Sequence, residues 1–156
     1  MITLTIPGYK ILIIENLVLD YNGTIACDGG LIDGVKELLN EISRDMAIHV
    51  LTADTFGTVR KQLEGVPCSV SVIRRENQAE AKAQYVRKIG SDTAICIGNG
   101  RNDVIMLEEA ALAVAVIQQE GAAAEVLLSA DIVCHTIIDA LKLIRNPLRL
   151  AATLRS

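Results

Sequence analysis

The chain has 156 residues, with 15 basic and 19 acidic side chains and a formal net charge of −4 at pH 7. Its length suits one domain with a substantial core, and its interspersed, mildly acidic charge excludes a nucleic-acid surface and a polybasic membrane patch. Although 51% of the residues are hydrophobic, there are only three tyrosines, one phenylalanine and no tryptophan, so we expect an aliphatic core.

The amino-terminal residues 1–16 are predicted to form a β-hairpin extension. Ile2–Ile6 alternates threonine with apolar residues, Pro7-Gly8 marks a turn, and Lys10–Ile14 is again extended. The hairpin carries no candidate chemistry. Because exposed strand edges invite aggregation, we expect it to cover a sheet edge or to contact a second subunit in a homo-oligomer.

An apolar run that ends in Asp20 follows the hairpin. The run is short and rich in leucine and valine, which is typical of a strand buried on both faces of a parallel sheet. Asp20 is then predicted to lie at the carboxyl edge of the sheet, where open α/β sheets bind ligands. The alternative is a structural strand that ends in an Asx turn.

Strands and helices alternate along the rest of the chain. This pattern predicts a three-layer, Rossmann-like α/β domain over residues 1–156 with a mainly parallel sheet. We expect further strands at Met46–Thr52, Val70–Ile73, Thr93–Gly98, Leu112–Val116 and Asp131–Cys134. We expect helices at Leu31–Ser43, Glu76–Ile89 and Gly121–Ser129. A further helix is expected to run from a cap at Asp54 or Thr55 to Leu63, and another to follow Asp103 and end near Ala110. The tail is expected to form a helix that breaks at Pro147 and resumes at Leu150–Leu154.

Three further polar segments could join Asp20 at the same edge. Thr52 ends the second strand, so its hydroxyl and the amides that follow could hold a phosphoryl oxygen. Lys82, on the helix before the fourth strand, could neutralise such a group. In Gly98-Asn99-Gly100-Arg101-Asn102-Asp103, two glycines permit a tight turn, and Asn99 and Asp103 offer the oxygen ligands that Mg²⁺ accepts. Each has a structural alternative: Thr52 could cap a helix, Lys82 could be a solvated helix residue, and residues 98–103 could form a strand-to-helix turn with Asn102 or Asp103 as the cap.

Together these segments resemble the motifs of the haloacid dehalogenase (HAD) superfamily. Asp20-Tyr21-Asn22-Gly23-Thr24 resembles its first motif, Asp-Xaa-Asp-Xaa-Thr, and the similarity is greatest to the phosphorylation domains of P-type ATPases, over residues 17–143. Asn22 stands where phosphatases have aspartate and pumps have threonine, and Asn99 stands where both usually have aspartate. The segment between Thr24 and Thr52 leaves no room for a nucleotide-binding insert, which excludes ion pumping. The resemblance therefore implies a soluble, capless, P-type ATPase-like phosphatase.

The resemblance also implies a mechanism and a set of residues. Asp20 attacks phosphorus to give an aspartyl-phosphate, which water hydrolyses, and turnover is slow because Asn22 cannot exchange a proton as a carboxylate does. The implied catalytic residues are Asp20, Asn22, Thr52 and Lys82. The implied phosphate contacts are Asp20, Tyr21, Gly23, Thr52, Ala53, Lys82 and Asn102, and the implied Mg²⁺ ligands are Asp20, the backbone of Asn22, Asn99 and Asp103. The partner is a phosphorylated small molecule or macromolecule.

Three other functions compete with this interpretation. A regulatory module of the same fold would bind phosphate or Mg²⁺ with little turnover, as the two asparagines suggest. A response-regulator receiver would carry its phosphorylated aspartate at the third strand end, where this chain has Arg74 and Arg75. A dinucleotide-binding protein would need a glycine-rich motif after its first strand. His49 and His135 lie in apolar runs and are predicted to be structural. The four cysteines are far apart, and no signal peptide or membrane span is evident, which predicts a reduced, cytoplasmic protein.

Overall fold

The computed structural model describes residues 1–54 and 57–156, so the predicted capping role of Thr55 lies outside the described residues. Its centre is a six-stranded, fully parallel sheet in the order β10-β9-β8-β3-β6-β7. The strands are β3 (Asn16–Asp20), β6 (Ala47–Thr52), β7 (Ser69–Val72), β8 (Ala94–Gly98), β9 (Leu112–Val116) and β10 (Ile132–Cys134). The predicted α/β class with a parallel sheet is confirmed.

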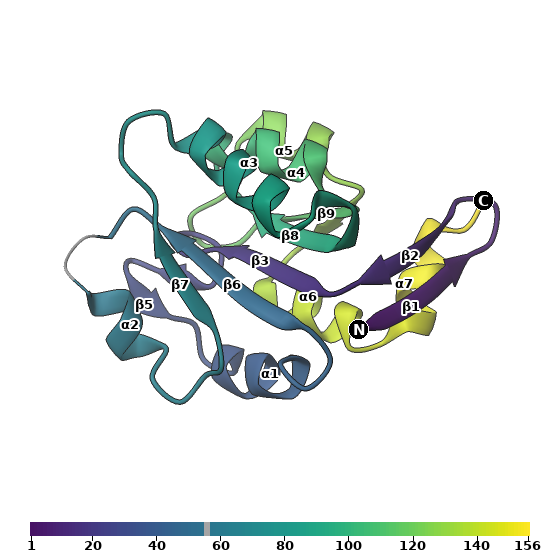
Figure 1. Ribbon diagram of the computed structural model, residues 1–156, viewed down its shortest axis with the longest axis horizontal. Coiled ribbons are helices and arrows are strands. Elements are labelled where there is room, and N and C mark those ends of the chain that lie inside the picture. Colours follow the sequence, from purple (N-terminus) through teal and green to yellow (C-terminus); the bar gives the residue numbers. More distant parts are fainter. Residues whose placement is uncertain (55–56) are drawn as a thin grey trace.

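Helices cover both faces of this sheet (Figure 1). One face carries α3 (Gln78–Ile89), α4 (Val104–Glu109) and α5 (Ala124–Ser129), and the other carries α1 (Val35–Ile42) and α6 (Ile137–Ile144). The short helix α2 (Thr58–Gln62) lies between β6 and β7, and α7 (Pro147–Leu154) ends the chain. Three layers result, as the alternating pattern predicts.

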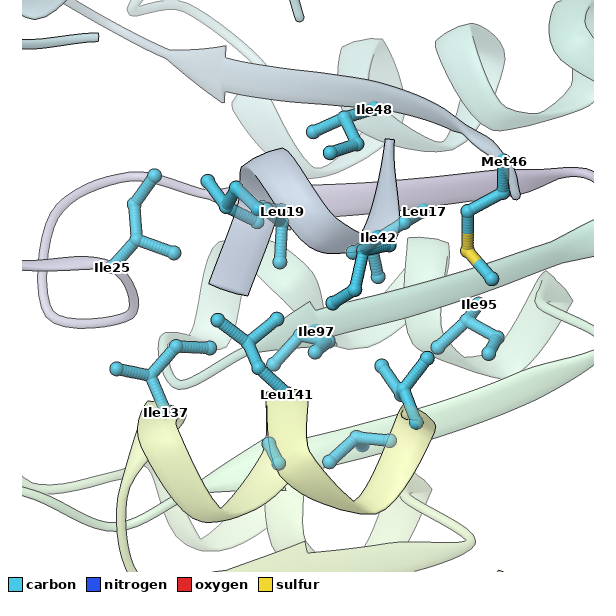
Figure 2. Close-up of a cluster of buried hydrophobic side chains, with 14 of the residues drawn as sticks. Leu17, Leu19, Ile25, Ile42, Met46, Ile48, Ile95, Ile97, Ile137 and Leu141 are labelled. Carbon is cyan, nitrogen blue, oxygen red and sulfur yellow. The ribbon is translucent and has the colours of Figure 1, made fainter. Parts of the chain in front are cut away.

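The two cores follow from the two-residue period of the strands. On β3, Leu17 and Leu19 face α1 and α6, whereas Val18 faces α3 and α4. The α1–α6 side is filled by large aliphatic side chains, among them Ile97 on β8 and Leu141 on α6, which point toward one another in Figure 2. Because every residue of β3 and β8 is buried, these strands form a rigid base for whatever lies at their ends.

The amino-terminal hairpin forms as predicted but does not cover a sheet edge. Strands β1 (Ile2–Ile6) and β2 (Lys10–Ile14) make their own antiparallel sheet, which extends away from the main sheet together with α7 (Figure 1). Its inner face packs against Leu150 of α7. Its outer face leaves Ile11 66% and Ile13 47% exposed. The edge strands of the main sheet, β7 and β10, are paired on one side only among the described residues.

Several predicted helix boundaries are wrong. Helices α1, α2 and α3 begin later than predicted, and each follows directly a residue with positive φ: Gly34, Gly57 and Asn77. A residue in this left-handed conformation cannot be part of a right-handed helix, so each helix begins only after it. Residues 30–31 instead form β5, which pairs with β4 (Ala26–Cys27). The last helix begins at Pro147 rather than at Leu150, because proline suits the first helical position.

The two histidines differ from each other. His49 is half-buried and lies 2.9 Å from the Tyr85 hydroxyl and 3.1 Å from Asn16 Oδ1, so it links β6, β3 and α3. His135 is exposed, which makes the prediction of a structural role wrong for that residue. Within residues 1–54 and 57–156, no helix has the length and hydrophobicity that crossing a bilayer requires.

Candidate active site

The predicted site residues converge at the carboxyl edge of the sheet. Asp20 is the last residue of β3, Thr52 is the last residue of β6, and Asn99 directly follows β8. The strand order β8-β3-β6 places Asp20 between the other two, and all three side chains are at least nine-tenths buried. Parallel strands end at one edge, so segments remote along the chain meet there.

Lys82 connects the two acidic groups of the site. It lies on the sheet-facing side of α3, where its side chain is almost fully buried. Its Nζ donates to Asp20 Oδ1 at 2.6 Å and to Asp103 Oδ1 at 2.7 Å. The alternative of a solvated helix lysine is therefore wrong. The electrostatic interaction between a buried ammonium and two buried carboxylates is strong, because little water screens the charges.

The charge at this site is not balanced. Burial raises the pKa of Asp20 to about 7, and the Asp103 carboxylate adds to this effect, while Lys82 and the Thr24 hydroxyl oppose it. Burial alone would lower the pKa of Lys82, but the two carboxylates outweigh burial and raise it, so the ammonium stays charged. One positive charge faces two carboxyl groups. The site thus has the residual negative charge that a bound cation neutralises.

Asp103 also holds the turn that follows β8. Its Oδ2 accepts hydrogen bonds from the amides of Asn99 at 3.1 Å and Gly100 at 2.9 Å. A Cβ on Gly98 would lie 2.6 Å from the Asp103 carboxylate, so only glycine leaves room for that side chain. Asp103 therefore caps the turn, as one alternative held, and also faces Lys82.

Two residues that hold the Asp20 loop escaped the sequence reasoning. The Thr24 hydroxyl lies 3.0 Å from Asp20 Oδ2 and 3.2 Å from Asn99 Oδ1. The Gln118 amide group donates to the carbonyls of Gly23 and Thr24 and accepts from the backbone N–H of Ile137. The threonine of the first motif was a signal for Thr24. Gln118 gave no signal, because its role depends on how two loops meet.

Gly23 packs directly against the site. Its φ is 79°, and a Cβ at this position would collide with the side-chain amide of Asn99. We expect Gly23→Ala to destabilise the fold by about 2–3 kcal/mol, because it adds a collision to the cost of a left-handed backbone. Gly65→Ala is the matched control, since Gly65 has φ 85° but open space around it. Urea unfolding of both variants measures the difference, and equal losses would show that the packing against Asn99 is unimportant.

Three other predicted residues line a cleft of about 330 Å³ that is formed in part by the turn directly after Asp20. Tyr21, Asn22 and Ala53 line it, and Asn22 is exposed. The Thr52 hydroxyl accepts from the Asp54 amide at 3.1 Å. The side-chain amide of Asn102, which is predicted to contact phosphate, donates to Gln78 Oε1 at 2.7 Å.

The donor set suits a hard divalent cation. Asp20, Asp103 and the amide oxygen of Asn99 supply oxygen atoms only, and the side-chain N–H of Asn99 is fixed by the Gly121 carbonyl at 3.0 Å. This bond and the Thr24 contact turn the amide oxygen of Asn99 toward Asp20. Oxygen ligands of this kind are the ones that Mg²⁺ prefers.

Known proteins resemble this chain in parts of its sequence and in its fold. No family model matches the chain. It is 30% identical over 135 residues to the soluble P-type ATPase-like phosphatase of Methanocaldococcus jannaschii, a match that covers 83% of this chain and 49% of that relative. It is also 51% identical over 61 residues to an uncharacterised protein of the same organism, covering 39% of this chain and 66% of the relative. The chain therefore spans about half the length of the named phosphatase.

Solved structures show the fold. The 3-deoxy-D-manno-octulosonate 8-phosphate phosphatase of Moraxella catarrhalis, in complex with magnesium ion, phosphate ion and KDO, matches with a TM-score of 0.70 at 12% identity, over 91% of this chain and 94% of that one. The cobalt-bound enzyme of Haemophilus influenzae matches with a TM-score of 0.70 at 13% identity, over 92% and 94%. By its fold, this chain is similar to solved structures of putative HAD-family hydrolases. Its distant homologue in Methanocaldococcus jannaschii carries the name of a soluble P-type ATPase-like phosphatase.

Proposed function

We propose that this chain is a metal-dependent phosphatase that acts on phosphate monoesters through an aspartyl-phosphate on Asp20. The observation that carries the proposal is the bridge of Lys82 between Asp20 and Asp103 at the carboxyl edge of the sheet. A structural ion pair needs one acid and one base. Two buried acids that share one base form a costly arrangement, which a binding or catalytic task accounts for.

The side chains of the site divide the work of phosphoryl transfer. An Asp20 oxygen attacks phosphorus, the alcohol oxygen of the ester leaves, and water then releases phosphate from Asp20. Lys82 and the Thr52 hydroxyl hold the oxygens of the transferred group, because phosphoryl transfer relies on positioning and on charge neutralisation. Thr24 fixes the orientation of the Asp20 carboxylate.

Asp20, Asn99 and Asp103 would hold the metal ion, together with the backbone carbonyl of Asn22. Magnesium suits this all-oxygen set, and the structural neighbours from Moraxella catarrhalis and Haemophilus influenzae hold magnesium and cobalt. When bound, such an ion neutralises negative charge on the phosphoryl group. Removal of the ion with a chelator is expected to stop turnover.

The direct test is phosphate release from a panel of phosphate monoesters with Mg²⁺, compared between the natural chain and Asp20→Asn. We expect slow release that depends on Mg²⁺ and on Asp20. Tight binding of phosphate and Mg²⁺ with no release by either chain would instead identify a regulatory module. Asn22 and Asn99, where phosphatases usually carry aspartate, are the residues that favour this second candidate.

Asn22 is expected to limit the rate. It lines the cleft at the turn directly after Asp20 and is exposed, so an aspartate there would meet solvent and the departing alcohol. We expect Asn22→Asp to speed release of phosphate from the phospho-enzyme by about 10²-fold or more, because a positioned acid or base contributes about 10²–10⁴ in rate. Single-turnover quench measurements follow the decay of the phospho-enzyme. Unchanged or slower decay would mean that Asn22 does not occupy the acid/base position.

The homo-oligomer and the cytoplasmic location stay predictions. The exposed outer face of the hairpin, with Ile11 and Ile13, is the surface we propose for subunit contact. Light scattering tests this, because Ile11→Lys should convert an oligomer to a monomer, and a natural chain that is already monomeric would remove the idea.

A further inference from the structure

Arg75 lies in the loop between β7 and α3. It lines the cleft of about 330 Å³ that also contains Tyr21, Asn22 and Ala53. It also lines a second, wider hollow of about 560 Å³, which includes Gln78, Arg101 and Asn102. Arg75 is the residue that these two linings share, so it lies between the cleft lined by Tyr21 and Asn22 and the hollow lined by Arg101 and Asn102.

Arg75 has no acidic partner among the described residues, and the same holds for the neighbouring Arg74. Lys82 is held by two carboxylates, Arg101 pairs with Glu125, and Arg87 pairs with Glu80 and Glu109. None of the ion pairs within residues 1–54 and 57–156 includes Arg75. An exposed guanidinium without an acidic partner can bind a ligand anion at low cost, because no internal contact has to be broken.

The net negative charge of the chain makes a cation at the position of Arg75 important for binding an anionic substrate. With a net charge of −4, the protein does not attract an anionic substrate by its overall field, so attraction has to come from cations near the cleft. Lys82 is committed to Asp20 and Asp103 at the phosphoryl position. A second anionic group on the substrate, beyond the phosphoryl group, would therefore meet Arg75. The flat guanidinium binds carboxylate or phosphate through two parallel hydrogen bonds, which gives geometric selection as well as charge.

We propose that Arg75 determines specificity by binding a second anionic group on the leaving alcohol, so that the substrates are phosphate monoesters of acidic alcohols. The second group is a carboxylate or a second phosphate. This inference rests on the proposed phosphatase function. Arg75 contacts the part of the substrate that departs, so it acts on binding and takes no part in the transfer to Asp20.

Matched substrate pairs test the inference. 3-Phosphoglycerate and glycerol 3-phosphate share a carbon skeleton and differ in a carboxylate, whereas fructose 1,6-bisphosphate and fructose 6-phosphate differ in a phosphate. We expect the natural chain to prefer the acidic member of at least one pair by about tenfold in kcat/KM. Arg75→Ala should raise KM for that member by about tenfold, leave kcat within twofold, and leave the less acidic member unchanged. The pair that responds identifies the anion.

Arg74→Ala is the matched control. It removes the same charge from the neighbouring position, but Arg74 lines a different hollow with Val72 and Glu80. Arg74→Ala should leave the preference for the acidic ester intact. Arg75→Lys should keep only part of that preference, because lysine has the positive charge but lacks the two parallel N–H donors of the guanidinium. Equal KM changes for both members of each pair, or equal effects of the Arg74 and Arg75 substitutions, would overturn the inference.

A binding experiment separates this inference from the phosphatase proposal. In Asp20→Asn, which cannot form the phospho-enzyme, calorimetry with Mg²⁺ measures the affinity for both members of each pair directly. We expect the acidic member to bind about tenfold more tightly, and adding Arg75→Ala should remove that difference. If the natural chain hydrolyses none of the four esters, the phosphatase proposal fails while this measurement still decides the role of Arg75. Hydrolysis without any acidic preference overturns the inference and leaves the phosphatase proposal standing.

Discussion

Asp20→Asn is expected to abolish turnover and, at the same time, to make the metal-free protein more stable. The substitution removes the attacking oxygen, so phosphate release should fall by about 10⁴-fold or more. The asparagine has almost the same shape, and its Oδ1 can still accept from Lys82. Because burial and the Asp103 carboxylate raise the pKa of Asp20 to about 7, its ionised form is unfavourable in the folded chain, and removing that charge should add about 1–2 kcal/mol to the free energy of unfolding at pH 8.

Chemical denaturation in a chelating buffer at pH 8, together with a phosphate-release assay, measures both effects on the same samples. Gain of stability with loss of activity is the signature of a functional site whose charges conflict with folding. A variant that is less stable than the natural chain would show that Asp20 serves the fold. A variant that retains more than about one hundredth of the turnover would exclude Asp20 as the nucleophile.

Lys82→Met is expected to give the largest loss of stability at any single site residue. Methionine fills a similar volume but leaves Asp20 and Asp103 facing each other without a cation in a buried site. Breaking a buried charge network from one side costs about 3–5 kcal/mol. Turnover should be lost as well. Denaturant unfolding at pH 8 measures the cost, and Mg²⁺ should restore more stability to this variant than to the natural chain, since a divalent cation supplies the missing positive charge.

Lys88→Met is the control for this experiment. It lies on the same helix, but its side chain is exposed, so its replacement should change stability by no more than about 0.5 kcal/mol. Asp20→Asn combined with Lys82→Met should be more stable than Lys82→Met alone, because the pair is coupled through direct contact. A loss below about 1 kcal/mol for Lys82→Met would mean that water reaches the site and screens the two carboxylates.

The convergence of Asp20, Thr52 and Asp103 could be predicted because it follows from topology. Each lies at or just after the carboxyl end of a buried strand, and a parallel sheet gathers those ends at one edge. Strand prediction depended on apolar runs, which are clear for β3, β8 and β9. Lys82 is a candidate from its position on the helix before the fourth strand, and only the structure shows that it contacts both acids at once.

The features that escaped prediction depend on loop conformation. Gln118 is 94 residues from Thr24 in the sequence, yet its side chain holds the loop after Asp20. No sequence pattern around either residue predicts this contact. The β4–β5 hairpin replaced the predicted start of α1 because the positive φ of Gly34 delays the helix. The hydrogen bond from Asn102 to Gln78 likewise depends on how α3 packs against the turn after β8.

A crystal structure of the protein with Mg²⁺ and beryllofluoride tests whether Asp20 is the nucleophile, since the beryllium fluoride group on an aspartate imitates an aspartyl-phosphate. With Asp20 as the nucleophile, we expect beryllium bonded to a carboxylate oxygen of Asp20, a magnesium ion shared by Asp20 and Asp103, and fluorines near Lys82 and Thr52. Beryllofluoride on another residue, or a magnesium ion held by Cys27, Asp28 and Glu120, whose possible ligand atoms all lie within 4.8 Å of one another, would contradict it.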